Sequence, residues 1–138
     1  MRQQFPRILL IDDNEHGLMA RRTLLEEQGY QVETATCGRE GLSKFSEQEF
    51  DLVVTDFRMP DLRGSQVLRR IRKQSEHMPV VILSGYVEKL GLTAESTGAN
   101  AVISKGPQEE QDLSRAIARF TKKKPAARLA RRAKAAVA

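Results

Sequence analysis

The chain has 138 residues, of which 40% are hydrophobic and 30% are charged, and its formal net charge at pH 7 is +5. These values suit one soluble domain with its own core, and no apolar run approaches the roughly 20 residues of a membrane span. A single cysteine excludes an internal disulfide, and with only two histidines there is no zinc site of the usual Cys/His kind. We therefore expect a cytoplasmic protein without a membrane segment.

Hydrophobic patterning predicts strands and helices that alternate along the chain. The strands are short, and several are apolar at nearly every position, which is typical of burial on both faces of a sheet. The helices carry apolar residues at spacings of three and four. The predicted strands cover 7–11, 31–35, 51–55, 79–83 and 99–103. The predicted helices lie between Asn14 and Gly29, at 38–48, from Gly64 onward, at 87–96 and at 107–121.

Several element ends follow from local sequence. Asn14 is a favoured N-cap, Gly29 a favoured residue just past a helix, and Pro107 is acceptable in a first helical turn. Pro60 cannot donate to a ladder, so the third strand ends before it. The helix at 87–96 has the weakest pattern, with Leu90 as its best core candidate.

Strands that alternate with helices predict a parallel sheet joined by right-handed crossovers. At this chain length, the expected fold is an α/β, flavodoxin-like (βα)5 fold. Its doubly wound five-stranded parallel sheet has the strand order 2-1-3-4-5. Strands one and three are then neighbours, and ligands bind beyond the carboxyl ends of such strands.

Polar residues follow four of the predicted strands at this edge. Asp12 and Asp13 follow the first strand, Asp56 the third, Ser84 the fourth and Lys105 the fifth. Three carboxylates in one crevice repel each other unless a cation neutralises them, and oxygen ligands of this kind suit Mg²⁺. A hydroxyl and a lysine beside them can stabilise a phosphoryl group. The set indicates phosphoryl transfer to Asp56.

Each member also has an ordinary structural explanation when taken alone. Asp12 and Asp13 could be acids at a helix N-terminus, Asp56 and Ser84 could be turn residues, and Lys105 could be solvated. The joint occurrence of all five at strand ends favours the functional interpretation.

The pattern resembles the receiver domain of bacterial two-component response regulators, most closely the single-domain, chemotaxis-type regulators. The resemblance covers about residues 7–120. The segments that carry it are 8–13 (ILLIDD), 51–64 (DLVVTDFRMPDLRG), 80–85 (VVILSG), and Gly98-Ala99 with Lys105.

The resemblance implies a role for each residue. Asp56 would take the phosphoryl group from the phosphohistidine of a sensor histidine kinase or histidine phosphotransfer protein, and Ser84 and Lys105 would contact it. Asp13 and Asp56 would bind Mg²⁺ directly, Asp12 chiefly through water, and Arg58 through its backbone carbonyl. Phosphorylation would then change partner binding, and possible homodimerisation, through helix four, strand five and helix five.

The sequence departs from the family at two positions near the lysine. Val102 stands where receivers usually carry an aromatic residue, and Gly106 separates Lys105 from Pro107. We expect a trans bond between Lys105 and Gly106, a reshaped loop, and an altered transmission of activation. Tyr86 lies two residues past Ser84 and is expected to slow hydrolysis of the acyl phosphate.

Residues 122–138 form a separate region by composition, so the expected domain covers residues 1–121. The last 17 residues hold seven Lys/Arg and no acid, which leaves 16 bases and 18 acids, a net charge of −2, in residues 1–120. Few hydrophobic residues predict disorder or a marginal helix. A solvated extension, an acidic partner and nucleic acid remain open as explanations for this basic tail.

The expected function is a phosphoryl-accepting signalling module of a phosphorelay, with self-catalysed chemistry but no enzymatic turnover. One alternative is a receiver fragment of a hybrid kinase or longer regulator, although a start Met favours a stand-alone chain. Another is a Mg²⁺-dependent aspartyl-phosphate phosphatase. It is disfavoured because such enzymes carry an Asp-x-Asp pair, whereas residues 12–14 are Asp-Asp-Asn.

Overall fold

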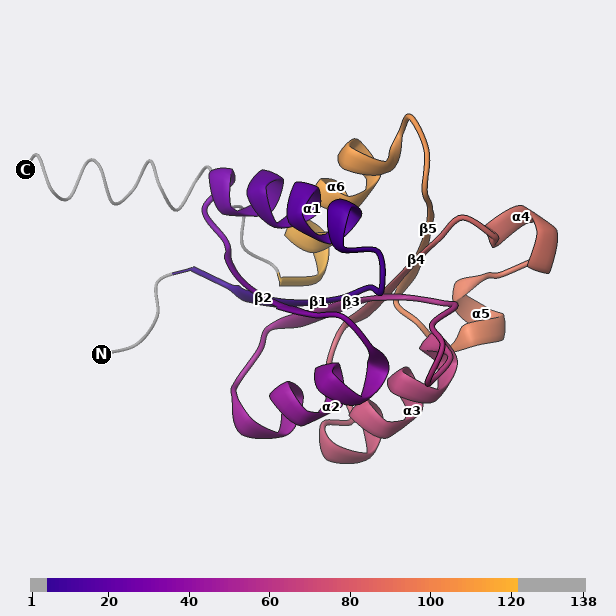
Figure 1. Cartoon of the computed structure of the whole chain (residues 1–138), viewed down its shortest axis with the longest axis horizontal. Helices are drawn as coiled ribbons and strands as arrows, with labels where there is room; N and C mark the ends of the chain where they lie inside the picture. The colour runs from indigo at the N-terminus through magenta and orange to yellow at the C-terminus, as the bar shows by residue number, and fades with distance from the viewer. Residues whose placement is uncertain (1–4, 122–138) are drawn as a thin grey trace, which may run out of the picture.

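A parallel sheet of five strands forms the centre of the computed structural model, which describes residues 5–121 (Figure 1). Its order is β2-β1-β3-β4-β5, as predicted. The strands are β1 (Arg7–Ile11), β2 (Gln31–Ala35), β3 (Leu52–Asp56), β4 (Val80–Ser84) and β5 (Ala101–Ser104). The helices are α1 (Glu15–Glu27), α2 (Gly38–Glu47), α3 (Gly64–Gln74), α4 (Val87–Leu90), α5 (Ala94–Thr97) and α6 (Glu109–Thr121).

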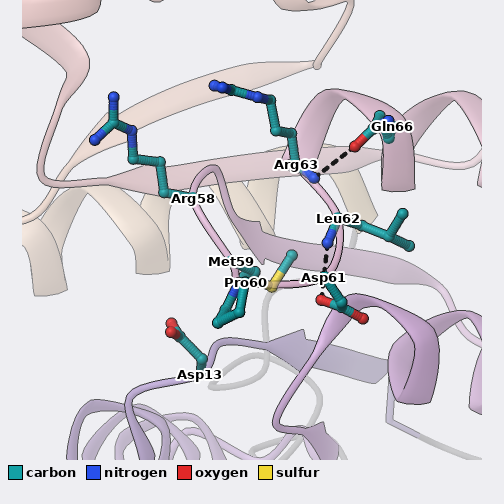
Figure 2. Close-up of a pocket in the computed structure, with 8 residues that line it drawn as sticks. All are labelled: Asp13, Arg58, Met59, Pro60, Asp61, Leu62, Arg63 and Gln66. Carbon is teal, nitrogen blue, oxygen red and sulfur yellow. Dashed lines mark hydrogen bonds between the residues drawn. The ribbon is translucent and has the colours of Figure 1, made fainter.

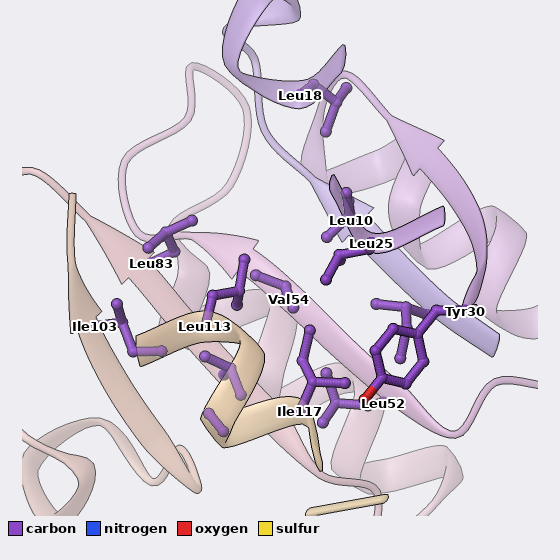
Figure 3. Close-up of a cluster of buried hydrophobic side chains, with 13 residues drawn as sticks. Leu10, Leu18, Leu25, Tyr30, Leu52, Val54, Leu83, Ile103, Leu113 and Ile117 are labelled. Carbon is purple, nitrogen blue, oxygen red and sulfur yellow. The ribbon is translucent and has the colours of Figure 1, made fainter. Parts of the chain in front are cut away.

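Helices cover both faces of the sheet, with α1 and α6 on one side and α2 and α3 on the other (Figure 1). Because side chains alternate along a strand, β1 contributes Ile8 and Leu10 to one core and Leu9 and Ile11 to the other. The first core packs under α1 and α6, as Figure 3 shows, and the second under α2 and α3. Burial on both faces explains the nearly continuous apolar strands.

Local sequence sets several of the helix ends. The Asn14 side chain accepts the backbone N–H of Gly17 and caps α1, as predicted. Gly29 follows α1 with a φ of 98°, a conformation that favours glycine. Gly64 begins α3 directly against the end of β3, where a Cβ atom would lie 2.6 Å from the carbonyl oxygen of Asp56.

The prediction of a single helix over residues 87–96 is wrong. The chain forms two single-turn helices there, because Gly91 takes a left-handed φ of 61° after α4 and Thr93 caps a new turn. Leu90, the expected core residue, is 41% exposed.

Other predicted bounds differ by one or two residues. β5 begins at Ala101 rather than Ala99, because Asn100 turns its side chain back to accept the N–H of Val80. α6 begins at Glu109 rather than Pro107. Residues 122–138 lie outside the described residues, so the basic tail and its boundary stay predictions. Within residues 5–121, no helix combines the length and apolar character needed to cross a membrane.

Candidate functional site

Three carboxylates meet at the carboxyl edge of the sheet, as predicted. Asp12 and Asp13 directly follow β1, and Asp56 is the last residue of β3, which pairs with β1. One ligand oxygen from each lies within 4.8 Å of the others. Asp12 and Asp56 are buried, and Asp13 is exposed. The oxygen-only donor set and its open side fit a hydrated Mg²⁺ ion.

Lys105 reaches into this cluster from the loop after β5. Its Nζ lies 3.0 Å from Oδ2 of Asp12 and 3.2 Å from Oδ2 of Asp56. The backbone N–H of Lys105 donates to the carbonyl of Ser84, which fixes the start of the loop. No cis peptide bond occurs between residues 5 and 121, so the trans bond expected before Gly106 is confirmed. The inserted glycine therefore still lets the lysine contact Asp56.

Burial raises the pKa of the Asp56 carboxyl above its ordinary value, and the nearby charge of Asp12 raises it further. The positive charge of Lys105 and hydrogen bonds from Lys105 and from the Phe57 N–H act in the opposite direction. The net direction is upward, so Lys105 does not fully compensate the buried negative charge. A further cation at this edge would favour the ionised carboxylate.

Arg21, which was absent from the predicted site, is a second cation at Asp12. Its Nη1 lies 3.1 Å from Oδ2 of Asp12, and its Nε lies 2.6 Å from Glu109 of α6. The contacts join residues distant in sequence, so no local motif reveals them. A signal exists nevertheless: Leu18, Arg21 and Leu25 lie at helical spacing, and both leucines are buried. A charged residue on that inward face requires a buried partner.

Ser84 lies at the same edge as Asp56. It is the last residue of β4, it is fully buried, and its neighbour Leu83 is the register partner of Asp56. Its Oγ accepts the backbone N–H of Tyr86 at 3.0 Å. A hydroxyl that accepts in this way keeps its own hydrogen for donation to a ligand.

Arg58 and Tyr86 follow the strand-end residues Asp56 and Ser84 by two positions each. The Arg58 guanidinium is 4.6 Å from the centroid of the Tyr86 ring, a cation–π contact between two exposed side chains. Val102 occupies the position at which receivers usually carry an aromatic residue. Its side chain is half-buried against Phe57, Ile82 and Ala99.

A pocket of about 500 Å³ opens beside Asp13. Figure 2 shows it between Asp13 on one segment and the loop before α3 on the other. Arg58 lines the same pocket as Asp13. The lining residues are Asp13, Arg58, Met59, Pro60, Asp61, Leu62, Arg63 and Gln66.

Comparison with known proteins gives consistent matches. A family model described as the response regulator receiver domain matches residues 8–118. The gliding motility regulatory protein of Myxococcus xanthus is 34% identical over 121 residues, which cover 83% of this chain and 15% of that protein. The uncharacterized transcriptional regulatory protein YkoG of Bacillus subtilis is 34% identical over 78% of this chain and 48% of that protein. The chain therefore spans less than half of either relative.

Solved structures match over nearly their full length. A response regulator receiver domain protein from Clostridium thermocellum superposes with a TM-score of 0.77 at 39% identity, covering 86% of this chain and 95% of that one. The response regulator TrrA of Thermotoga maritima, solved in complex with Mg²⁺ and BeF, gives a TM-score of 0.76 at 28% identity. That match covers 84% of this chain and 99% of TrrA.

Proposed function

The chain belongs to the response regulator receiver domain family, and from this we propose that it accepts a phosphoryl group on Asp56 in a two-component phosphorelay. The donor is the phosphohistidine of a sensor histidine kinase or histidine phosphotransfer protein. The product stays on the chain as an aspartyl phosphate, which acts as a signal because it changes partner binding.

The observation that carries this proposal is the contact of Lys105 Nζ with Asp56 Oδ2 at 3.2 Å, inside a cluster with Asp12 and Asp13. A carboxylate oxygen of Asp56 attacks phosphorus, the phosphorus–nitrogen bond breaks, and the imidazole leaves with its bonding electrons. Lys105 pairs with a phosphoryl oxygen as negative charge accumulates on the transferred group. Ser84 donates its hydroxyl hydrogen to another phosphoryl oxygen.

A Mg²⁺ ion would be held by Asp12, Asp13, Asp56 and the carbonyl of Arg58. When bound, it supplies positive charge for the carboxylates and the phosphoryl oxygens. The donor chemistry of the three carboxylates supports this assignment. The Mg²⁺ and BeF complex of the related TrrA supports it independently.

The relatives point to the kinds of partner. They include transcriptional regulators and a sensor protein, GacS of Pseudomonas syringae. We assign the output to the face formed by α4, α5, β5 and α6, which correspond to the predicted helix four, strand five and helix five. Ser84 ends β4 and Lys105 follows β5, its neighbour in the sheet, so both residues adjoin this face. The output partner acts on this face after Asp56 is phosphorylated.

Intact-mass spectrometry after incubation with acetyl phosphate and Mg²⁺ tests the proposal. We expect an adduct of one phosphoryl group in the wild type and none in Asp56→Asn. Asp112→Asn, which changes an exposed carboxylate on α6, is the matched control and should keep the adduct. An adduct that persists in Asp56→Asn, or one that forms equally in excess chelator, contradicts the proposal.

A further inference from the structure

Arg21 forms a bridge between the acidic cluster and α6. Its guanidinium donates through Nη1 to Asp12, and through Nε and Nη2 to the two carboxylate oxygens of Glu109 at 2.6 and 3.3 Å. We propose that Arg21 competes with the divalent cation for Asp12, and that Glu109 couples this competition to the N-terminus of α6. The inference rests on the proposed Mg²⁺ site and adds a positioning residue to it.

The three side chains are largely withdrawn from solvent. Their exposed fractions are 6% for Asp12, 12% for Arg21 and 17% for Glu109. Charges interact more strongly there than at the surface, because less water screens them. Gly17, one turn earlier on α1, leaves room for the guanidinium, since a Cβ atom there would lie 2.7 Å from Nη1 of Arg21. A side chain at position 17 would therefore require the guanidinium to shift from this position.

The hydrogen-bonding capacity of Asp12 is already heavily used. Its Oδ2 accepts from both Arg21 and Lys105, and its Oδ1 accepts the backbone N–H of Asn14 at 2.9 Å. A cation that binds at Asp12, directly or through water, draws on the same oxygens and repels the guanidinium. Cation binding therefore weakens the contact between Arg21 and Asp12, and Arg21 in turn lowers the affinity for the cation.

Glu109 is the remaining partner of the Arg21 guanidinium when a cation binds at Asp12. It lies in the first turn of α6 and holds two nitrogens of the guanidinium in a fork. A stronger hold by Glu109 makes it easier for Arg21 to leave Asp12. Because coupling between two sites is reciprocal, events at α6 that pull on Glu109 must also change the cation affinity. This route from the cluster to α6 does not pass through Val102.

Mg²⁺ titration of the unphosphorylated protein by calorimetry tests the competition. We expect Arg21→Met, which keeps the apolar stem, to bind Mg²⁺ roughly fivefold more tightly than the wild type. Arg22→Met makes the same charge change on the same helix at a side chain that is 42% exposed and paired with Glu26. This control should differ little from the wild type.

A second variant probes the bridge from the other end. Glu109→Gln leaves Arg21 held mainly by Asp12, so it should weaken Mg²⁺ binding, whereas Glu110→Gln at an exposed neighbour should not. In an Arg21→Met background, the effect of Glu109→Gln should shrink towards zero, which is the signature of coupling in a double-mutant cycle. Should thermal unfolding show that Arg21→Met does not fold, the comparison of Glu109→Gln with Glu110→Gln still tests the bridge: equal Mg²⁺ affinities in these two variants would overturn it.

Nuclear magnetic resonance supplies a readout that does not depend on affinity. The Nε–H signal of Arg21 should shift on Mg²⁺ addition, while that of Arg22 should stay unchanged. Wild-type binding that is no weaker than in Arg21→Met overturns this inference alone. Absence of Mg²⁺ binding in both proteins overturns the proposed cation site together with it.

Discussion

The guanidinium of Arg58 lies over the ring of Tyr86, 4.6 Å from its centroid. These residues come two positions after Asp56 and Ser84, respectively, so the contact joins the loops that follow β3 and β4. We expect this contact to act as a cover across the path by which water would reach an acyl phosphate on Asp56.

Removing the ring should therefore shorten the life of the phosphorylated state. We expect Tyr86→Ala to speed loss of the phosphoryl group by roughly two- to fivefold. This range is the free energy of an exposed cation–π contact converted to a ratio of rates. The decay is followed by intact mass after removal of the phosphodonor. Leu90→Ala removes another exposed apolar side chain nearby and should not change the rate. Decay in Tyr86→Ala that is as slow as in the wild type would disprove the role of the cover.

Lys105 should matter for stability as well as for phosphorylation. Lys105→Met leaves Asp12 and Asp56 without their shared cation, which should cost about 1–3 kcal/mol of unfolding free energy at neutral pH. The cost should shrink as the pH falls through the raised pKa of Asp56, because protonation removes the negative charge that the lysine neutralises. Urea unfolding at several pH values measures both. A loss of stability that is independent of pH would show that the lysine acts through packing and not through charge.

Asp61 ties the loop after β3 to α2. Its carboxylate accepts the backbone N–H groups of Gly38 and Arg39, the first two residues of α2, at 3.0 and 2.8 Å. Burial alone would raise the pKa of Asp61, but the N–H groups of Arg39, Gly38 and Leu62 outweigh it, and the net pKa is lowered. The folded-state pKa thus lies below the unfolded one, so this stabilisation is complete above the unfolded pKa and is lost as the pH falls through the folded pKa.

Asp61→Asn should therefore lower the free energy of unfolding by about 1 kcal/mol at pH 7, the usual size of a helix-cap effect. The difference from the wild type should close as the pH falls below about 4, because the wild-type carboxyl then becomes neutral as well. Urea unfolding at pH 7, 5 and 3 provides the comparison. A gap that stays constant across this range would contradict the charge-based explanation.

Gly64 is the glycine whose replacement should most directly disturb Asp56, the proposed phosphoacceptor. A Cβ atom there would lie 2.6 Å from the carbonyl oxygen of Asp56 and 2.9 Å from Cα of Phe57, both of which are backbone atoms. We expect Gly64→Ala to cost about 1–3 kcal/mol, as overpacking does, and to reduce phosphorylation. Gly85→Ala is the matched control, since a Cβ atom there would meet nothing within 4 Å. Equal melting temperatures for the two variants would refute this explanation.

Much of the fold was predictable, because burial on both faces leaves a direct mark on the strands. The apolar runs in β1, β3 and β4 located the central strands, and the alternation with helices led to the observed order. The carboxylate cluster followed from that order, since Asp12 and Asp56 end neighbouring strands. The roles of these residues remain proposals.

The features that sequence reasoning missed depend on single backbone angles or on distant contacts. The helix predicted over 87–96 divides at Gly91, whose left-handed φ interrupts an otherwise helical pattern. The position of Arg21 depends on Glu109, 88 residues further along the chain. Neither partner predicts the other, because their contact exists only after α1 and α6 pack on the same face of the sheet.

The two single-turn helices between β4 and β5 also bear on how the chain assembles. A helix is costly to nucleate, so turns as short as α4 and α5 gain little before a surface exists to receive them. We expect this crossover to close late, which leaves β4 as a temporary sheet edge during folding. Its residues Val80–Leu83 are all apolar, and an unpaired edge of that kind can pair with other chains. The segment next to Ser84 would thus be the point at which newly made chains are most exposed to aggregation.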